Sequence, residues 1–489
     1  MCGIAGYFTK DNINNSIIAE EMIDCMRHRG PDAQGYEVIE SNENNLVLAH
    51  TRLSIQDLSP LGNQPFINKD KDVFLVFNGE IYNFQDLRKQ LILKGYRFTS
   101  SSDTEVLLYS YIEWGEDLTN HIKGDFAFCI VDKRINKLLL YRDPLGVKPV
   151  YYLLSGDSFV FSSEIKAILR FPGVKKEINK DVLAEYLING WVYEPDTMFK
   201  DIKKLEAGHF IKLNLGDRTF EKIKYFDISS KDSETDLDKL IDKALKYQTI
   251  SDAPLGLYLS GGVDSSVIAA KVKKTGRIFT LTASMKEDEL SYEGFEDDLK
   301  YAKEVVNQYE NLDLQIVELD YSMIDYYKKL VYYIEEPIAD PAIVPAYLLA
   351  KKARDKGFKV MLSGMGADEL FGGYSRYLAY SKISSIVLGR QIAFIVKTFS
   401  KFGQYLLRKG KFLKLFRDLE RISNALSKKF PLNYIYLMSY CSEKEVLDLV
   451  GSDSVNKFYK KAAGFSELKN LTELQKISYI DLKGFLASH

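Results

Sequence analysis

The sequence has few cysteines, and they are widely spaced. Its 489 residues include 4 cysteines, and no two of them form a Cys-x-x-Cys pair. They stand at Cys2, Cys25, Cys129 and Cys441. This spacing argues against a zinc site or a disulfide framework and favours a reducing compartment.

The chain also lacks an excess of charge of one sign and any long apolar run. The formal net charge is −2, so no overall field would recruit nucleic acid. No uncharged apolar run is long enough to span a bilayer, and no signal peptide precedes Cys2. There is no internal repeat. We therefore expect a cytoplasmic protein that binds neither nucleic acid nor membrane.

The composition is that of a globular protein with more than one domain. Hydrophobic residues make up 46% and charged residues 27% of the chain. A chain of 489 residues is too long for one core. A polar stretch at 229–236 favours a boundary just before it. The prediction is one domain at 1–215 and a second at 216–489.

Cys2 directly follows the initiator methionine. Removal of Met1 would leave a thiol and a free α-amine on the same residue, and an amine with a pKa of about 7.7–8.0 can exchange protons with its own side chain. The small, apolar residues behind it predict a buried strand. Taken alone, a Met-Cys pair is more often an ordinary buried cysteine.

The rest of the first half alternates strands with a few helices, an α+β pattern. Strands are expected at 46–55, 73–77, 125–131, 137–141, 150–154 and 158–162, and helices at 83–95 and from Ser102 or Asp103 onwards. Asn78-Gly79 is expected in a loop between a strand and a helix.

Hydrolysis of an amide by a cysteine needs a base, an oxyanion hole and groups that hold the substrate. The Cys2 amine could be the base, and Asn78 with the Gly79 amide could form the hole. Arg52 and Asp103 have opposite charges and could bind the two ends of an α-amino acid. Taken singly, these residues also fit a solvated ion pair and an ordinary turn.

Several motifs in a fixed order carry a family resemblance. They are Cys2-Gly3-Ile4-Ala5-Gly6, Arg29-Gly30-Pro31-Asp32, Arg52-Leu53-Ser54-Ile55, Asn78-Gly79-Glu80-Ile81-Tyr82-Asn83, Ser102-Asp103-Thr104-Glu105, Arg142-Asp143 with Gly146-Val147-Lys148-Pro149, and Ser163-Glu164-Ile165-Lys166-Ala167. Together they resemble the glutaminase domain of class II glutamine amidotransferases of the asparagine synthetase B type.

The resemblance implies an N-terminal-nucleophile hydrolase fold, with two sheets between layers of helices. It implies Cys2 as the nucleophile and Asn78 with Gly79 as the oxyanion hole. It further implies that Arg52 binds the glutamine carboxylate and that Glu80 and Asp103 lie at the amino-acid end of the substrate.

A small-residue loop opens the second half. A strand at 255–259 runs into Ser260-Gly261-Gly262-Val263-Asp264-Ser265-Ser266, with a helix expected at 267–274. Backbone amides at such a helix start can hold an anion, and Asp264 would need Mg²⁺ between itself and a phosphate. No Walker A lysine follows. A generic glycine-rich turn is the alternative, but the string resembles the PP-loop of ATP pyrophosphatases.

A second such loop follows a strand at 359–362. It reads Ser363-Gly364-Met365-Gly366-Ala367-Asp368-Glu369. Loops that follow parallel strands meet at one edge of a sheet, so Asp264 and Asp368 could hold Mg²⁺, although Asp368-Glu369 also suits a helix N-cap. The resemblance extends to the family's synthetase domain, an α/β doubly wound (HUP-like) parallel-sheet fold. It implies that Leu259, Leu281, Ser363 and Gly364 lie against the nucleotide, together with Ser260, Gly261, Gly262, Asp264 and Ser265.

Two features depart from the family pattern. Met365 stands where the family usually has Glu or Asp. This difference leaves open which carboxylate is the acceptor and how efficiently it is amidated. The sequence stops at His489, where the family continues, so a fragment lacking part of the synthetase site is expected. In addition, residues 382–430 carry twelve Lys/Arg against two Asp/Glu. We expect there an amphipathic helical insert packed on its own domain, with a membrane or partner face as the alternative.

The sequence therefore predicts a glutamine-dependent carbon–nitrogen ligase. Glutamine hydrolysis would supply ammonia, and ATP would be cleaved to AMP and pyrophosphate to amidate a carboxylate, with aspartate as the first candidate. The expected small molecules are glutamine, ATP, Mg²⁺ and the acceptor, with a homodimer as an open expectation. The alternatives are another acceptor, such as a sugar uronic acid, or a scaffold that is non-catalytic or hydrolyses glutamine only.

Overall fold

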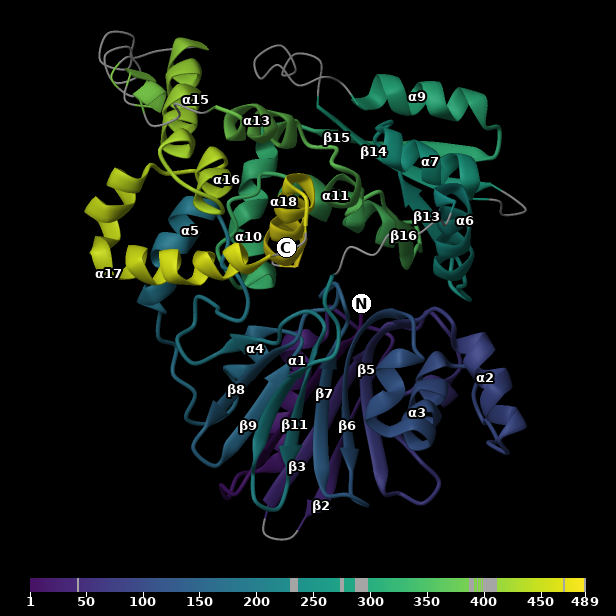
Figure 1. Ribbon diagram of the computed structural model, residues 1–489. Helices are drawn as coiled ribbons and strands as arrows, with labels where there is room; N and C mark the ends of the chain where they lie inside the picture. The colour runs from purple at the N-terminus through teal and green to yellow at the C-terminus, as the bar shows by residue number, and fades with distance from the viewer. Residues whose placement is uncertain are drawn as a thin grey trace.

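The structure is a computed structural model that describes residues 1–41, 44–228, 236–272, 277–285, 298–386, 391–393, 395–396, 398, 411–468 and 471–487. It has an antiparallel, strand-rich domain below and a helix-rich domain with a parallel sheet above (Figure 1). The N-terminus lies at the end of the strand-rich domain that faces the other domain (Figure 1). Cys2 is thereby placed close to the junction.

One six-stranded sheet contains the N-terminal strand. Its order is β10-β8-β9-β1-β3-β2, and each neighbouring pair is antiparallel. The strands are β1 (Gly3–Thr9), β2 (Ala33–Ser41), β3 (Asn44–Arg52), β8 (Tyr151–Ser155), β9 (Ser158–Ser162) and β10 (Lys203–Lys204). Because β1 lies between β9 and β3, its whole length is buried.

A second antiparallel sheet packs against the first. Its order is β12-β11-β7-β6-β5-β4. The strands are β4 (Phe66–Ile67), β5 (Val73–Ile81), β6 (Gly124–Asp132), β7 (Lys137–Arg142), β11 (His209–Asn214) and β12 (Phe220–Lys224). Since β12 pairs with β11, this sheet continues past residue 215 to Lys224.

The two sheets form the centre of a four-layer sandwich. Side chains alternate along a strand, so Ile4 and Phe8 face the core between the sheets, whereas Ala5 and Tyr7 face the helices. The first sheet is covered by α1 (Asn15–Met26) and α4 (Ile165–Ile168), and the second by α2 (Phe84–Leu93) and α3 (Asp103–Trp114). This arrangement confirms the predicted N-terminal-nucleophile hydrolase sandwich.

The second domain is built on a parallel sheet with the order β15-β14-β13-β16. Its strands are β13 (Leu255–Tyr258), β14 (Ile278–Met285), β15 (Leu312–Leu319) and β16 (Val360–Leu362). One face packs against α6 (Leu237–Gln248), α7 (Val263–Lys271) and α9 (Asp298–Gln308), and the other against α11 (Ile343–Asp355). Helices on both faces confirm the predicted doubly wound α/β fold.

The remaining helices extend this domain. They are α10 (Tyr326–Ile334), α12 (Ala367–Phe371), α13 (Ser375–Ser384), α15 (Lys411–Leu426), α16 (Leu432–Leu437), α17 (Glu443–Ala463) and α18 (Glu473–Asp481). Short helical turns lie at Pro60–Gly62, Gly115–Asn120, Lys180–Val182, Tyr321–Asp325, Gly464–Glu467 and Leu482–Leu486.

The basic stretch 382–430 is only partly described. Residues 387–390, 394, 397 and 399–410 lie outside the described residues. Where the structure describes it, the end of α15 is buried at Ala425 and Leu426, and Ser423 donates a hydrogen bond to the Ala393 carbonyl at 2.8 Å. The described end of this stretch therefore packs on its own domain.

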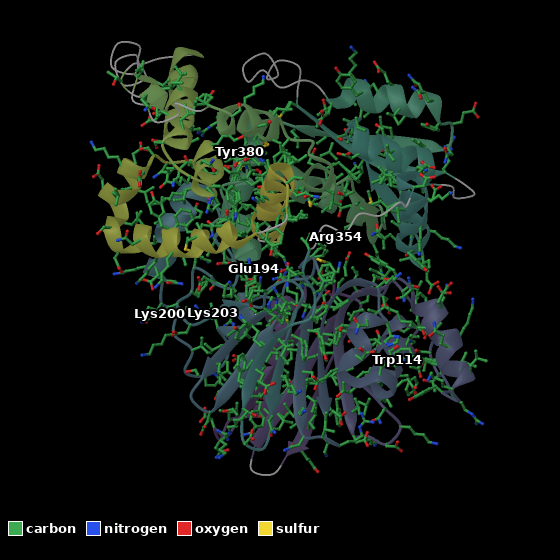
Figure 2. All side chains as sticks on the ribbon, in the orientation of Figure 1. Trp114, Glu194, Lys200, Lys203, Arg354 and Tyr380 are labelled. Carbon is green, nitrogen blue, oxygen red and sulfur yellow. The ribbon has the colours of Figure 1, made fainter. Side chains whose placement is uncertain are left out.

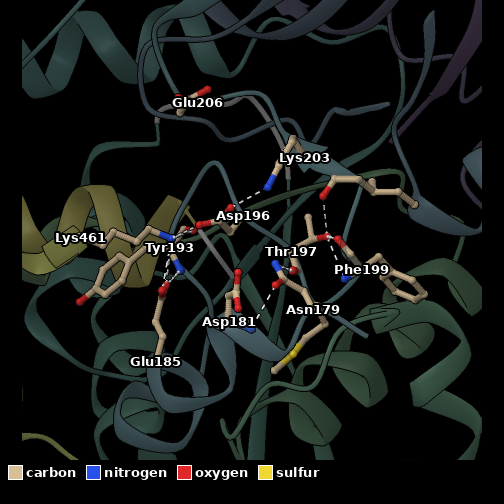
Figure 3. A network of polar contacts seen from close by, with 12 residues as sticks. Asn179, Asp181, Glu185, Tyr193, Asp196, Thr197, Phe199, Lys203, Glu206 and Lys461 are labelled. Carbon is tan, nitrogen blue, oxygen red and sulfur yellow. Dashed lines mark hydrogen bonds and ion pairs between the residues drawn. The ribbon is translucent and has the colours of Figure 1, made fainter. Parts of the chain in front are cut away.

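Ion pairs join the two domains where α5 (Leu183–Asn189) packs against α17. Lys461 Nζ contacts Glu185 Oε2 at 3.2 Å and Asp196 Oδ2 at 2.9 Å (Figure 3). Burial raises the pKa of Glu185 to about 7, although the Lys461 charge opposes this shift. Nearby, Glu194 lies between the domains (Figure 2) and forms a buried ion pair with Arg142.

Among the described residues, no helix combines the length and the apolarity needed to cross a bilayer.

Candidate functional site

The Cys2 thiol lies against the backbone of Leu53. The Leu53 N–H donates to Cys2 Sγ at 3.3 Å, and the thiol donates back to the Leu53 carbonyl at 3.6 Å. Leu53 directly follows β3, the strand that pairs with β1. The strand pairing therefore brings a backbone donor to the Cys2 sulfur and holds it in one place.

The electrostatic surroundings of the thiol favour its neutral form. Burial raises the pKa of Cys2, while the N-terminal charge and the Leu53 hydrogen bond act in the opposite direction. Burial also lowers the pKa of the neighbouring Met1 α-amine to about 5, because the charged form loses its hydration. Both shifts describe the chain with Met1 in place, whereas removal of Met1 would put the free α-amine on Cys2 itself.

Asn78 and Gly79 lie within β5, opposite Ala127 and Phe126 of β6. The predicted loop is therefore wrong, because strand pairing continues through these residues to Ile81. The Asn78 side chain is 1% exposed, and both its Nδ2 and its Oδ1 lack a hydrogen-bond partner among the described residues. Leaving a buried amide unpaired costs about 1–3 kcal/mol. Such a group is available for a ligand.

Glu80 and Asp103 form a buried acidic pair beside this strand. Burial raises the pKa of Glu80 well above its usual value, and the Asp103 charge adds to the shift. Burial also raises the pKa of Asp103 to about 6, although the Ile81 N–H donates to its Oδ2 at 3.0 Å. A bound cationic group would relieve this repulsion. The pair is therefore suited to an α-ammonium group.

Arg52 is buried and holds the loop that follows it. Its guanidinium donates to the Ser59 carbonyl at 2.7 Å and to Asn63 Oδ1 at 2.8 Å, and it also donates to the carbonyls of Gln56 and Asp57. A Cβ atom on Gly62 would overlap the guanidinium. In this structure Arg52 holds the loop at 56–63 in shape. Its binding of a substrate carboxylate stays a prediction.

Arg29 and Glu164 belong to motifs that the sequence analysis quoted without assigning a role. Arg29 Nε donates to the Cys2 carbonyl at 2.9 Å, and its Nη1 lies 3.2 Å from Glu164 Oε1. Burial alone would raise the pKa of Glu164, but the His28 hydrogen bond and the charges of Arg29 and Lys166 lower it to about 2. The Arg-His-Arg-Gly sequence was the only signal for Arg29 in the chain. It does not reveal the contact with Cys2, because only folding brings these two residues together.

The first loop of the second domain runs from β13 into α7. The Gly262 N–H and Ser265 Oγ both contact Ser260 Oγ, at 3.3 and 3.1 Å. Gly261 has a φ of 79°, and a Cβ there would crowd Tyr301. The helix begins at Val263 rather than at the predicted residue 267, because Gly262 serves as its N-cap. Asp264 and Ser265 therefore lie in its first turn.

The second loop runs from β16 into α12 and touches the first loop. A Cβ on Gly364 would lie 2.9 Å from Asp264 Cβ, so the two loops pack closely. Burial raises the pKa of Asp264, and the Asp368 charge adds to this. Two carboxylates that repel each other beside a helix start fit a hard divalent cation. No group of three acidic, histidine or cysteine side chains suited to a metal occurs in the described part of the chain.

Leu259, Leu281 and Ser363, which are predicted to lie against the nucleotide, have different surroundings. Leu259 and Leu281 are buried in the cores on the two faces of the sheet, so only their backbone could meet a nucleotide. Ser363 Oγ accepts the Met365 N–H at 3.0 Å and shapes its loop. The Met365 side chain is 82% exposed.

Two family models match this chain, one in each half. Residues 1–226 match the model described as glutamine amidotransferase domain, and residues 236–489 match the model described as asparagine synthase.

Two relatives match over most of this chain. Asparagine synthetase [glutamine-hydrolyzing] 1 of Bacillus subtilis is 37% identical over 77% of this chain and 59% of its own length. A Methanocaldococcus jannaschii protein, provisionally named asparagine synthetase [glutamine-hydrolyzing] 2, is 32% identical over 94% of this chain and 90% of its own. The chain thus spans less than two thirds of the Bacillus relative.

Among solved structures, the glutamine phosphoribosylpyrophosphate amidotransferase of Bacillus subtilis aligns with 64% of this chain and 81% of its own. The identity is 16% and the TM-score is 0.35, a likeness too weak to bear on function.

Proposed function

We propose that this chain, which belongs to the asparagine synthase family, transfers ammonia from glutamine to a carboxylate that it activates with ATP, and that the carboxylate is that of aspartate. Cys2 would hydrolyse glutamine in the first domain, and the two loops after β13 and β16 would bind ATP in the second. The unpaired buried amide of Asn78, on a strand of the domain that carries Cys2, is the observation that supports the first half most directly.

Glutamine hydrolysis would begin with the Cys2 thiol. Once Met1 is removed, the Cys2 amine takes the thiol proton, and the sulfur attacks the carboxamide carbon. The carbonyl oxygen becomes an oxyanion, which Asn78 Nδ2 and the Gly79 N–H would stabilise as hydrogen-bond donors. The proton held by the Cys2 amine passes to the departing nitrogen as the intermediate collapses, the C–N bond breaks, and ammonia is released. Water then cleaves the Cys2 thioester to give glutamate.

The two ends of glutamine would be held by opposite charges. Arg52 would face the α-carboxylate from the base of the loop that it holds. Glu80 and Asp103 would face the α-ammonium, whose positive charge offsets the repulsion that raises their pKa values.

The second domain would use ATP to activate the acceptor. The acceptor carboxylate attacks the α-phosphorus, pyrophosphate leaves, and ammonia displaces AMP from the acyl-adenylate. Backbone amides and hydroxyls of Ser260–Ser265 and of Ser363–Gly364 would bind the phosphates, at the start of α7. Asp264 and Asp368 would hold Mg²⁺, which when bound neutralises phosphate charge.

Ammonia must pass from one site to the other as a neutral molecule. Protonation in bulk water would remove it, so we expect an enclosed path between the domains. The N-terminus lies at the end of the first domain that faces the second (Figure 1), which supports this arrangement.

The decisive experiment measures the glutamine-dependent reaction and the ammonium-dependent reaction separately. We expect Cys2→Ala to abolish glutamine-dependent formation of the amide while activity with added ammonium persists. Loss of both activities in a folded variant would contradict this division of labour.

Met365 supports a second candidate for the acceptor. An exposed methionine stands where the family usually has an acid, so another carboxylate, such as that of a sugar uronic acid, is the alternative to aspartate. Pyrophosphate release measured across candidate acids decides between them. Glutamate production without ATP consumption at any acid would indicate a glutaminase alone.

A further inference from the structure

Lys359 of the second domain reaches the backbone that holds the nucleophile of the first. Its Nζ lies 2.6 Å from Asp32 Oδ2 and donates to the Ser54 carbonyl at 3.4 Å. Ser54 directly follows Leu53, whose N–H and carbonyl both contact the Cys2 thiol. Two consecutive residues, Leu53 and Ser54, therefore link a side chain of the second domain to the sulfur.

Asp32 fixes this backbone from two sides. Its Oδ2 accepts the Ser54 N–H at 2.7 Å, and its own N–H donates to the Arg52 carbonyl at 3.0 Å. The Lys359 ammonium and the Ser54 N–H share one carboxylate oxygen, so loss of the lysine leaves the carboxylate that positions Ser54 without its counter-charge.

We propose that Lys359 is a positioning residue for Cys2: through Asp32 and Ser54 it fixes the Leu53 peptide against the thiol, so that the glutaminase site is complete only when the second domain is docked. This inference deepens the proposed function and rests on it for the reaction concerned. The substrate of that site would be a primary carboxamide.

The place of Lys359 in the chain gives this contact a direct link to the other site. The residue immediately precedes β16, and Ser363 immediately follows that strand. At about 3.3 Å per residue, β16 covers roughly 10 Å. A three-residue strand thus connects the contact beside Cys2 to the loop proposed to bind ATP.

The environment of the ion pair supports a lasting contact. The Lys359 and Asp32 side chains are 31% and 29% exposed, so water screens their attraction only in part. Burial would raise the pKa of Asp32, but the hydrogen bonds from Lys359 and Ser54 lower it. Asp32 is therefore ionised near neutral pH and remains paired with Lys359.

The test compares Lys359→Met with a matched contact between the domains. Lys457 of α17 pairs with Asp181 at 2.8 Å and with Asp453 of its own helix at 3.1 Å, so Lys457→Met removes a lysine contact between the domains that does not involve the residues around Cys2. We expect Lys359→Met to lower kcat for glutamine hydrolysis about tenfold with little change in KM, since small displacements of reacting groups are costly. Lys359→Arg should restore most of this loss, and Lys457→Met should change neither constant.

A second readout does not depend on glutamine turnover. Alkylation of Cys2 by iodoacetamide, followed by peptide mass spectrometry, reports how well Leu53 stabilises the thiolate. In Lys359→Met the pH profile of alkylation should move to higher pH, and Asp32→Asn should move it in the same direction without adding to the effect. Thermal unfolding of each variant confirms that it is folded.

The outcomes separate the two proposals. Identical alkylation profiles in Lys359→Met and Lys457→Met would overturn the role of Lys359, whatever the glutaminase rates. A chain that is alkylated at Cys2 but releases no glutamate would contradict the proposed function, while the alkylation profiles would still decide the role of Lys359.

Discussion

The Glu335 carboxylate of the second domain accepts the backbone N–H of Ile165 in the first domain at 2.9 Å. It also accepts the next N–H, that of Lys166, at 2.6 Å. These are the first two amides of α4, which have no acceptor within their own helix, and an anion is favoured at that end. One domain therefore caps a helix of the other, directly after Glu164, which holds Arg29 beside Cys2.

This cap should make stability depend on pH. Burial raises the pKa of Glu335 from 4.5 to about 7. A group whose pKa is higher in the folded state stabilises that state below its unfolded pKa, and the contribution is lost as the pH rises through the folded value. We expect this group to lower the free energy of unfolding by up to about 3 kcal/mol as the pH rises.

The measurement compares the chain with Glu335→Gln in denaturant unfolding between pH 4.5 and pH 7. The variant should show a flatter dependence on pH over this interval. Equal slopes would mean that Glu335 does not titrate there.

Asn78→Leu should separate activity from stability. Leucine has a similar size and removes an unpaired buried amide, so we expect the free energy of unfolding to rise by about 1 kcal/mol. Glutamine hydrolysis should fall at least about a hundredfold in kcat, the usual loss for one oxyanion donor. Denaturant unfolding and glutamate release measure the two effects.

Asn83 provides the matched control. Its Nδ2 donates to the His121 carbonyl at 2.9 Å, and its Oδ1 accepts the Lys123 N–H at 2.8 Å. Asn83→Leu should therefore lower stability by about 1–3 kcal/mol. Equal effects at both positions would show that Asn78 is hydrogen-bonded in solution.

Asp368→Asn should weaken the dependence on magnesium in the second domain only. Loss of one of two carboxylates should raise the Mg²⁺ concentration for half-maximal pyrophosphate release by about tenfold or more. Glutamine hydrolysis should be unchanged. Asp355→Asn, at the exposed end of α11, is the control and should leave both reactions as they are. An unchanged requirement for Mg²⁺ in Asp368→Asn would remove this residue from the site.

Lys461→Met should destabilise the contact between α5 and α17. Removing the cation leaves the Glu185 carboxylate buried without its partner, at a cost of about 3 kcal/mol or more. The loss should grow with pH, since Glu185 can protonate in acid. Lys461→Met with Glu185→Gln should recover much of the stability in thermal unfolding, and a double variant no better than the single one would contradict this account.

The sequence predicts the elements and the domain order well, because these depend on local patterns. The run of small and apolar residues after Cys2 predicts a buried strand, and β1 is buried along its whole length. The helix at Asp103 begins where its N-cap, Ser102, predicts it. Small residues after β13 and β16 indicate the two loops of the second domain.

The contacts that complete the sites are less accessible to sequence reasoning. Asn-Gly is typical of a turn, yet tertiary pairing with β6 keeps Asn78 and Gly79 in an extended strand. Lys359 carries no local signal of a role, since Asp32 stands 327 positions away along the chain and only folding brings the two together. Arg52 was predicted from its charge and from the family resemblance, and neither reveals that four of its contacts go to its own loop.

The position of Asn78 within a sheet has a practical consequence for redesign. A side chain fixed by strand neighbours on both sides cannot be shifted to suit a bulkier or differently angled amide without disturbing the strands around it. If Asn78 is the proposed donor, selections for new nitrogen sources would therefore do better to leave β5 unchanged and to vary exposed positions of the loop that follows β3, such as Leu58 and Leu61.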